Sequence, residues 1–183
     1  MQHNEKRIAV QLAKDLIESN AVVIDTETTS LDGVAIQIAL VSLRDGSVIY
    51  KSYVHTDQEI DPRAHDVHGI SLDDLKDAPS AEKVGAELDA LLDGKILVAY
   101  NANFDAVICN NTFPNSDFLN NDWVCAMYDI AVPLTGSTNQ YGSISLANAL
   151  RRLGLKWRGN AHDAAGDCLA TADLISAVAQ TNI

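Results

Sequence analysis

One stretch decides how this chain can fold: Val22-Val23-Ile24-Asp25-Thr26-Glu27-Thr28-Thr29. Residues 21–24 are apolar and mostly β-branched, which predicts a buried strand. Because residues two apart on a strand point to the same face, Asp25 and Glu27 would lie side by side where it ends. Two carboxylates at that distance repel each other, and a divalent cation, which prefers oxygen ligands, would relieve the repulsion. Taken alone, this pair leaves a metal site and an ordinary acidic loop equally open.

Further strands are predicted on either side of a tight turn. Residues 34–43 and 47–55 are strand-like, and Arg44-Asp45-Gly46 between them is typical of a hairpin turn. With the strand at 21–26 they would form a three-stranded antiparallel meander. The apolar runs at 96–100 and 123–125 predict two more strands.

Helices are predicted between and after these strands. The expected ranges are 5–18, 81–92, 104–111, 126–132, a helix ending at 153, and 163–179. Capping side chains mark several of the starts, namely Asn4, Ser80, Asn103, and Ser143 or Ser145. Pro133 is expected to stop the helix at 126–132. The segment 61–75 is expected to be irregular, with short helical turns.

The first predicted helix carries an apolar stripe. Ile8, Leu12 and Leu16 fall four residues apart, which places them on one face. This face could pack on its own domain or on a second subunit, and we expect the first. In the helix at 81–92, Leu91 is expected to face inward with its apolar neighbours. Strands alternating with helices after a meander predict one α/β domain over residues 1–183, with a mixed central sheet flanked by helices.

Length and composition limit the class of protein. The chain has 183 residues, enough for one core, and 47% of them are hydrophobic. Because the apolar runs fall short of the roughly 20 residues that a membrane span needs, we expect no membrane association. The first residues are polar and lead into an amphipathic segment, so we expect a cytoplasmic protein. Cys109, Cys125 and Cys168 each have apolar neighbours, which favours reduced thiols over a disulfide or a zinc site.

The charge is uneven along the chain. The formal net charge is −12, whereas nucleic-acid-binding proteins usually have a basic surface. Between residues 57 and 93 there are eleven acids against three bases. A short basic stretch comprises Arg151, Arg152, Lys156 and Arg158. It could contact phosphate groups, or it could be a solvated helix end.

Two further acidic sites lie where predicted elements begin. Asp105 falls in the first turn of a predicted helix, and Asp167 falls in the first turn of the last one, after His162-Asp163. The helix dipole and free N–H groups stabilise acids at such positions, so each site alone has an ordinary structural explanation.

The order and spacing of these sites resemble a known family. The chain contains Asp25-Thr26-Glu27, then Asn101-Ala102-Asn103-Phe104-Asp105, then His162-Asp163-Ala164-Ala165-Gly166-Asp167. This series resembles the DEDDh-type 3′–5′ exonucleases, whose pattern is Asp-x-Glu, Asn-x-x-Phe-Asp and His-x-Ala-x-x-Asp. The resemblance extends over most of the chain and implies a ribonuclease H-like fold.

The resemblance also implies roles for the polar residues. Two divalent cations, Mg²⁺ or Mn²⁺, would be held by Asp25, Glu27, Asp105 and Asp167. His162 would be the general base, for which a pKa near neutrality is suitable. Water would then attack the terminal phosphodiester and release a 5′-mononucleotide from a 3′ end. We expect Asp163, between the two motif residues, to be a solvated bystander.

The family pattern determines the substrate-binding residues less closely than the metal ligands. In the family, the region of Thr28 and Leu31 lines the terminal nucleotide, although a polar turn followed by a buried leucine would also fit. Phe104 could contact substrate or act as a core anchor that directs Asp105. Asn101 is a further candidate for substrate binding, or it could fix the geometry of its turn. Tyr141 and Trp157 could stack on bases or belong to the core.

Three functions are consistent with this sequence. The first is a 3′–5′ exonuclease acting on DNA, preferably single-stranded. The second is a 3′–5′ exoribonuclease acting on RNA or short oligoribonucleotides, since the metal ligands act on phosphate whichever sugar is present. The third is a non-catalytic, polymerase-associated module, against which the five retained polar residues argue. The expected partner is single-stranded DNA or another nucleic-acid 3′ end, and the sequence leaves a homodimer or a polymerase-type partner open.

Overall fold

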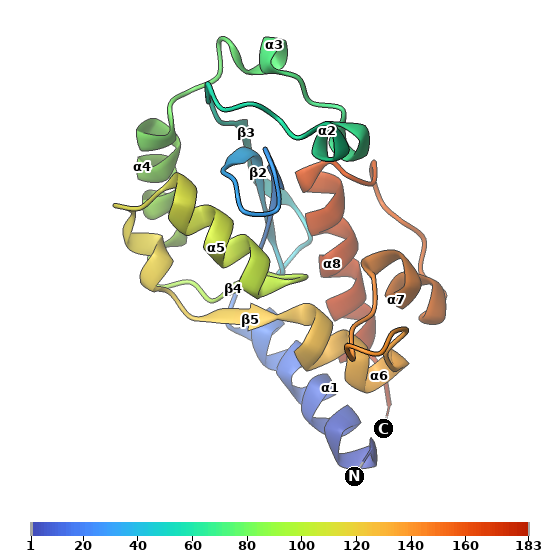
Figure 1. The fold of residues 1–183 in the computed structure, drawn as a ribbon. Coiled ribbons are helices and arrows are strands. Elements are labelled where there is room, and N and C mark those ends of the chain that lie inside the picture. The colour runs from blue at the N-terminus through green and yellow to red at the C-terminus, as the bar shows by residue number, and fades with distance from the viewer. Residues whose placement is uncertain (1, 183) are drawn as a thin grey trace.

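A five-stranded mixed sheet forms the centre of the computed structural model, which describes residues 2–182 (Figure 1). The strand order is β3-β2-β1-β4-β5. β1 (Val22–Thr28), β2 (Ala35–Ser42) and β3 (Val48–Tyr53) form the antiparallel meander. β4 (Leu97–Ala99) and β5 (Trp123–Cys125) extend the sheet in parallel with β1. The predicted α/β class and mixed sheet are therefore confirmed.

Helices cover both faces of the sheet. Their bounds are α1 Gln2–Glu18, α2 Pro62–His68, α3 Leu72–Leu75, α4 Ala81–Leu92, α5 Ala102–Thr112, α6 Val132–Thr135, α7 Leu146–Arg152 and α8 Ala164–Ala179, with a 3₁₀ turn η1 at Asp117–Asn120 and a π turn η2 at Met127–Ala131. One core cluster joins the sheet to α4 and α5. The other joins it to α1, α7 and α8 (Figure 1). Because both faces are covered, β1 and β2 are buried along almost their whole length.

α1 packs on its own domain, as expected. Its buried residues include Ala9, Ala13 and Leu16, and the helix contacts α8, α6 and η2. Ile8 is 59% exposed, so its predicted place in the stripe is wrong. The contact is centred on the small alanines because they allow α1 to approach α8 closely. The helix also begins at Gln2, which puts Asn4 inside its first turn and not at the cap.

Three other expectations about helices are corrected. α5 begins at Ala102 with Asn101 at its N-cap position, so Asn103 lies within the helix. Pro133 lies in the first turn of α6, where a missing N–H is harmless, and the chain passes from η2 into α6 instead of stopping. Leu91 is 39% exposed because it lies at the edge of the face that α4 turns to the sheet.

The cysteines carry free thiols, as expected. Cys109 and Cys168 are buried, and burial raises the pKa of both thiols, which keeps them neutral and unreactive. Within residues 2–182, none of the helices combines the length and the apolar character that a bilayer crossing requires.

The basic stretch is partly used inside the protein. Arg158 makes a two-pronged contact with Asp173 of α8, with N–O distances of 3.0 and 2.8 Å. Arg152 donates to the carbonyl oxygen of Gly136 at 2.8 Å and also to that of Thr135. These arginines therefore fix the loops around α7 and α8, which favours the structural explanation of their charge.

Candidate active site

Three carboxylates meet beside the second half of β1. Asp25 and Glu27 come from β1, and Asp167 comes from the first turn of α8. One oxygen from each of the three lies within 4.8 Å of the others. The alternation of side chains along β1 brings Asp25 and Glu27 to the face that α8 covers. Residues 140 positions apart in the chain thus form one acidic cluster.

Asp105 lies next to this cluster but outside the group of three. It comes from the first turn of α5 and is 3% exposed. The hydroxyl of Thr26 donates to Asp105 Oδ1 at 2.9 Å, which ties α5 to the middle of β1. After burial, the charge of Asp105 is the largest cause that raises the pKa of Asp25. All four acids of the sequence pattern are therefore close enough to affect one another's charge.

Burial and mutual repulsion disfavour the charged forms of these acids. Burial is the main cause in each case, and it raises the pKa of Asp25 well above its usual range. The pKa rises to about 8 for Glu27, to about 7 for Asp105 and to about 6 for Asp167. Oxygen ligands that are crowded and short of counter-charge fit a hard divalent cation. The described residues thus suit a divalent cation.

The stability of the metal-free protein is expected to fall as the pH rises. An acid whose pKa is raised by folding stabilises the folded state fully below its unfolded pKa, and this effect is lost as the pH passes its folded pKa. For Glu27 that window runs from the ordinary value of 4.5 to about 8. Thermal unfolding in EDTA from pH 5 to pH 8 measures this decline.

Divalent cations should reverse the decline at pH 8. At a Mn²⁺ concentration of 100 times Kd, binding to the folded state adds about 2.7 kcal/mol. His68 has the opposite dependence, because burial lowers its pKa and disfavours its proton in the folded state, but it is one group against four. A melting temperature in EDTA that stays flat or rises over this range would contradict the account of the cluster.

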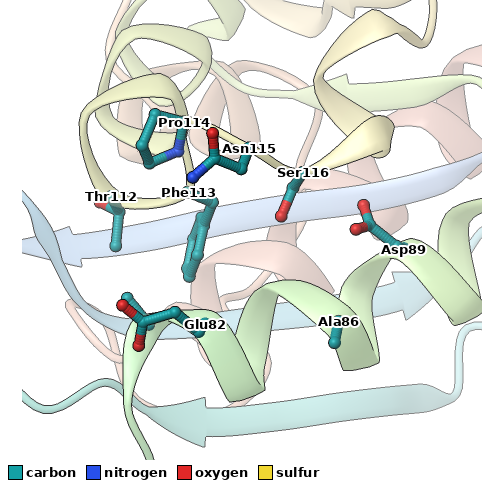
Figure 2. A pocket seen from close by; sticks show the side chains of 9 residues that line it. Glu82, Ala86, Asp89, Thr112, Phe113, Pro114, Asn115 and Ser116 are labelled. Carbon is teal, nitrogen blue, oxygen red and sulfur yellow. The ribbon is translucent and has the colours of Figure 1, made fainter.

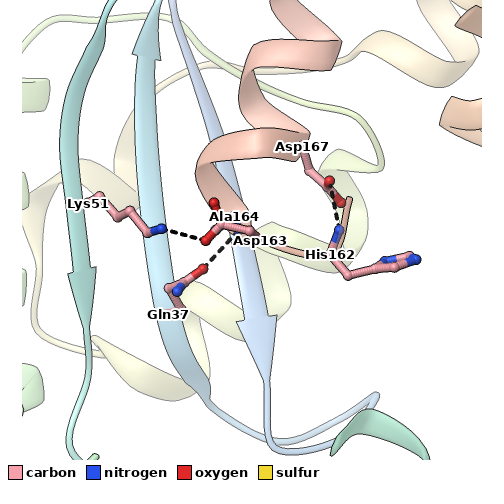
Figure 3. Close-up of polar contacts among 6 residues, drawn as sticks. All are labelled: Gln37, Lys51, His162, Asp163, Ala164 and Asp167. Carbon is pink, nitrogen blue, oxygen red and sulfur yellow. Dashed lines mark hydrogen bonds and ion pairs between the residues drawn. The ribbon is translucent and has the colours of Figure 1, made fainter. Parts of the chain in front are cut away.

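His162 is joined to the cluster through its backbone. Its N–H donates to Asp167 Oδ1 at 3.1 Å, while its imidazole is exposed and points away from Asp167 (Figure 3). The residue has a left-handed backbone, with φ of 61°. The structure therefore places the predicted base on the turn beside the cluster, with its ring directed to solvent.

Asp163 is not simply solvated, as the sequence had suggested. Its side chain is 28% exposed and forms an ion pair with Lys51 of β3 (Figure 3). The charge of Asp163 also contributes to the raised pKa of Glu27. Asp163 therefore belongs to the surroundings of the cluster, and Lys51 partly balances the local negative charge.

A pocket of about 530 Å³ adjoins Glu27. Thr28, Leu31 and Phe104 line it, which brings together three of the four residues predicted to bind substrate. Leu31 is 84% exposed, so the alternative of a buried leucine is wrong. Phe104 is half-buried with its ring in the pocket lining, which disfavours a pure core anchor. Asn101 is exposed at the start of α5, outside the described lining.

α2 forms the wall of this pocket that the sequence motifs did not indicate. Arg63, Val67 and His68 line it. The backbone N–H of Ile70 donates to His68 Nδ1 at 3.0 Å, so His68 Nε2 carries the proton and donates to the carbonyl of Thr28 at 3.1 Å. His68 thus holds α2 against the end of β1. These contacts give His68 a structural role.

Neither of the two candidate stacking residues lies in this lining as described. Trp157 is half-buried and packs against the core cluster of α1 and α8, in agreement with a core role. Tyr141 is 78% exposed on the loop between α6 and α7.

A smaller hollow, of about 270 Å³, lies between α4 and the segment after α5 (Figure 2). Its lining includes Glu82, Asp89 and Phe113. Asp89 accepts the backbone N–H of Phe118 at 2.9 Å, so this carboxylate holds η1 in place. The hollow lies on the α4–α5 side, away from α8, and we therefore assign the chemistry to the acidic cluster and the pocket beside Glu27.

Known proteins share both the sequence pattern and the fold. An exonuclease family model matches residues 22–175. Uncharacterized exonuclease CP81 of Escherichia phage 186 is 29% identical over 182 residues, which cover 93% of each chain. The PolC-type DNA polymerase III of Thermotoga petrophila is 37% identical over 89 residues, 46% of this chain but 6% of that protein. The chain thus spans less than a tenth of such polymerases.

Solved structures agree with this result. Exonuclease X, in complex with 5′ overhanging duplex DNA, superposes with a TM-score of 0.65 at 28% identity, over 86% of this chain and 90% of that one. Escherichia coli exonuclease I, in complex with a dA16 oligonucleotide, has a TM-score of 0.66 at 20% identity and shares the fold over 83% of this chain and 39% of its own. The family match, the fold and the acids beside β1 together lead to one conclusion: this chain belongs to the DEDDh-type 3′–5′ exonuclease family.

Proposed function

We propose that the protein hydrolyses the terminal phosphodiester of DNA from the 3′ end, releases 5′-mononucleotides and uses two Mg²⁺ or Mn²⁺ ions. The observation that carries this proposal is the convergence of Asp25, Glu27 and Asp167, whose carboxylate oxygens lie within 4.8 Å of one another. Acids that are crowded together without counter-charge destabilise the folded protein, and a module without catalytic function has no need for them. This also argues against a purely non-catalytic module.

The four acids would hold the cations. The charges of Asp105, Asp167 and Glu27 all raise the pKa of Asp25, which supports a central role for this carboxylate. We therefore assign Asp25 to both ions, Glu27 and Asp167 to one of them, and Asp105 to the second. Bound divalent cations would supply positive charge for the phosphate oxygens and lower the pKa of the attacking water.

His162 would take the proton from the attacking water. Its backbone N–H donates to Asp167, and the ring would reach the cluster only after rotation about its side-chain bonds. Imidazole accepts and releases protons near neutral pH, which suits a base that must be restored after each cleavage.

The pocket beside Glu27 would bind the terminal nucleotide. Leu31 and Phe104 present apolar surface on which a base can pack, and Thr28 lines the pocket next to Glu27 in the chain. Asn101, exposed at the start of α5, would contact the strand outside this pocket. Arg63 is a cation at the pocket rim whose side chain is 92% exposed, and its Nε lies 3.5 Å from Asp61. Water weakens so exposed a pair, so a phosphate could compete for Arg63.

The similarity to exonuclease X favours DNA as the substrate, since that protein was solved with duplex DNA. Oligonucleotides labelled at the 5′ end test both polarity and sugar choice. We expect Mn²⁺-dependent stepwise shortening from the 3′ end of single-stranded DNA, and slower shortening of the matching RNA. Internal cuts, or loss of the 5′ label as a mononucleotide, would contradict the polarity, and faster digestion of RNA would establish the exoribonuclease alternative.

A further inference from the structure

We infer that Gln37 is a positioning residue for hydrolysis and that it acts through the turn that carries His162. This inference rests on the function proposed above. Gln37 is the one buried polar residue of strand β2, where it is 3% exposed, and Ser42 at the strand's end is only partly buried. A buried amide on a strand requires a specific partner, because an unpaired polar group is costly to bury.

That partner is the first residue of α8. Gln37 Oε1 accepts the backbone N–H of Ala164 at 2.9 Å (Figure 3). Gln37 is also the cross-strand partner of Glu27 in the β1–β2 register, so the two side chains share the face that α8 covers. The amide thus connects the sheet, at the position next to a proposed metal ligand, to a residue two positions after His162.

A second strand holds the same turn. Lys51 of β3 pairs with Ala39 in the sheet register, which puts it on the same face as Gln37. Its ammonium forms the ion pair with Asp163. With 43% of the Lys51 side chain exposed, water weakens this pair, whereas the hydrogen bond from Ala164 is buried. We therefore assign the main positioning role to Gln37.

α8 holds the turn from its other side. A Cβ atom built on Gly166 would overlap the carbonyl oxygen of Asn160, so the chain crosses this helix at the closest possible distance. The left-handed backbone of His162 is unfavourable for a residue with a side chain and persists only where its surroundings fix it. Without the acceptor on Gln37, the turn loses one of the contacts that hold it. The backbone that carries the His162 imidazole would then be less well positioned.

Two substitutions of nearly equal length test this inference. Gln37→Met keeps the shape and removes the strong acceptor, while Gln37→Glu keeps an acceptor oxygen. In metal-free protein, we expect hydrogen–deuterium exchange in residues 158–164 to be faster for Gln37→Met and close to wild type for Gln37→Glu. We expect kcat with Mn²⁺ to fall by about 10- to 100-fold for Gln37→Met. Lys51→Met should lower kcat less than Gln37→Met does.

A double-mutant cycle identifies the group through which Gln37 acts. In a His162→Asn background, Gln37→Met should lower kcat by less than about 2-fold, because the residue it positions is already gone. Full additivity, or a Mn²⁺ affinity reduced about tenfold or more in Gln37→Met, would overturn the inference, as would wild-type exchange and kcat in that variant. Inactive wild-type protein would instead refute the proposed function, and the exchange measurement would still test the hydrogen bond.

Discussion

Asp25→Asn is expected to lower kcat by at least about 10³-fold with either Mg²⁺ or Mn²⁺, a loss typical of removing a central catalytic group. Asp25 lies in the acidic cluster, and its pKa responds to Asp105, Asp167 and Glu27. Asparagine keeps the shape but offers a neutral, weaker ligand, so both proposed cations lose a contact.

The same substitution should stabilise the metal-free protein at pH 8. Removing one carboxylate avoids the cost of burying its charge and reduces the repulsion within the cluster. We expect the free energy of unfolding to rise by about 1–3 kcal/mol. Asp57→Asn is the matched control, because the carboxylate of Asp57 is fully exposed. It should leave both kcat and the melting temperature in EDTA nearly unchanged. An Asp25→Asn variant that retains activity, or that is less stable than wild type in EDTA, would contradict the roles given to Asp25.

His162→Asn is expected to lower kcat by about 10²- to 10⁴-fold, the range for a general base. Asparagine tolerates a left-handed backbone better than most residues, so the turn should survive. The contact with Asp167 comes from the backbone N–H of residue 162 and should also remain. Mn²⁺ affinity measured by isothermal titration should therefore stay within about threefold of the wild-type value. This limit corresponds to a difference of less than about 1 kcal/mol in the free energy of binding.

The contrast between these two variants is the informative result. His162→Asn should lose catalysis and keep metal binding, whereas Asp25→Asn should lose both. Equal Mn²⁺ affinity in the two variants would contradict the division of roles. Activity of His162→Asn close to wild type would show that another group accepts the proton.

The arrangement at the end of β1 could be predicted because it follows from local rules. A period of two puts Asp25 and Glu27 on one face, and the first helical turns explain Asp105 and Asp167. That these sites meet was implied by the resemblance to the family and not by any one motif. The Gly and Ser signals around the hairpin and α4 were also sufficient to place those elements.

Other features depend on tertiary contacts that no local pattern contains. The acceptor of Gln37 meets an N–H that lies 127 residues away, so this contact could not be read from a polar residue within an apolar run. Ile8 was misplaced because close packing of α1 on α8 favours alanine at the contact. Pro133 was taken as a stop because its position relative to the start of α6 was unknown. The direction of the His162 ring is a choice among rotamers of an exposed side chain, which local sequence does not determine.

Anomalous diffraction from crystals soaked with Mn²⁺ and a nucleoside 5′-monophosphate tests the central claim most directly. We predict two Mn²⁺ peaks, both bound by Asp25, with Glu27 and Asp167 at one and Asp105 at the other, and the nucleotide base in the pocket beside Glu27. Crystals with an accessible site that show no Mn²⁺ at these carboxylates, or Mn²⁺ bound elsewhere with the nucleotide, would contradict the account.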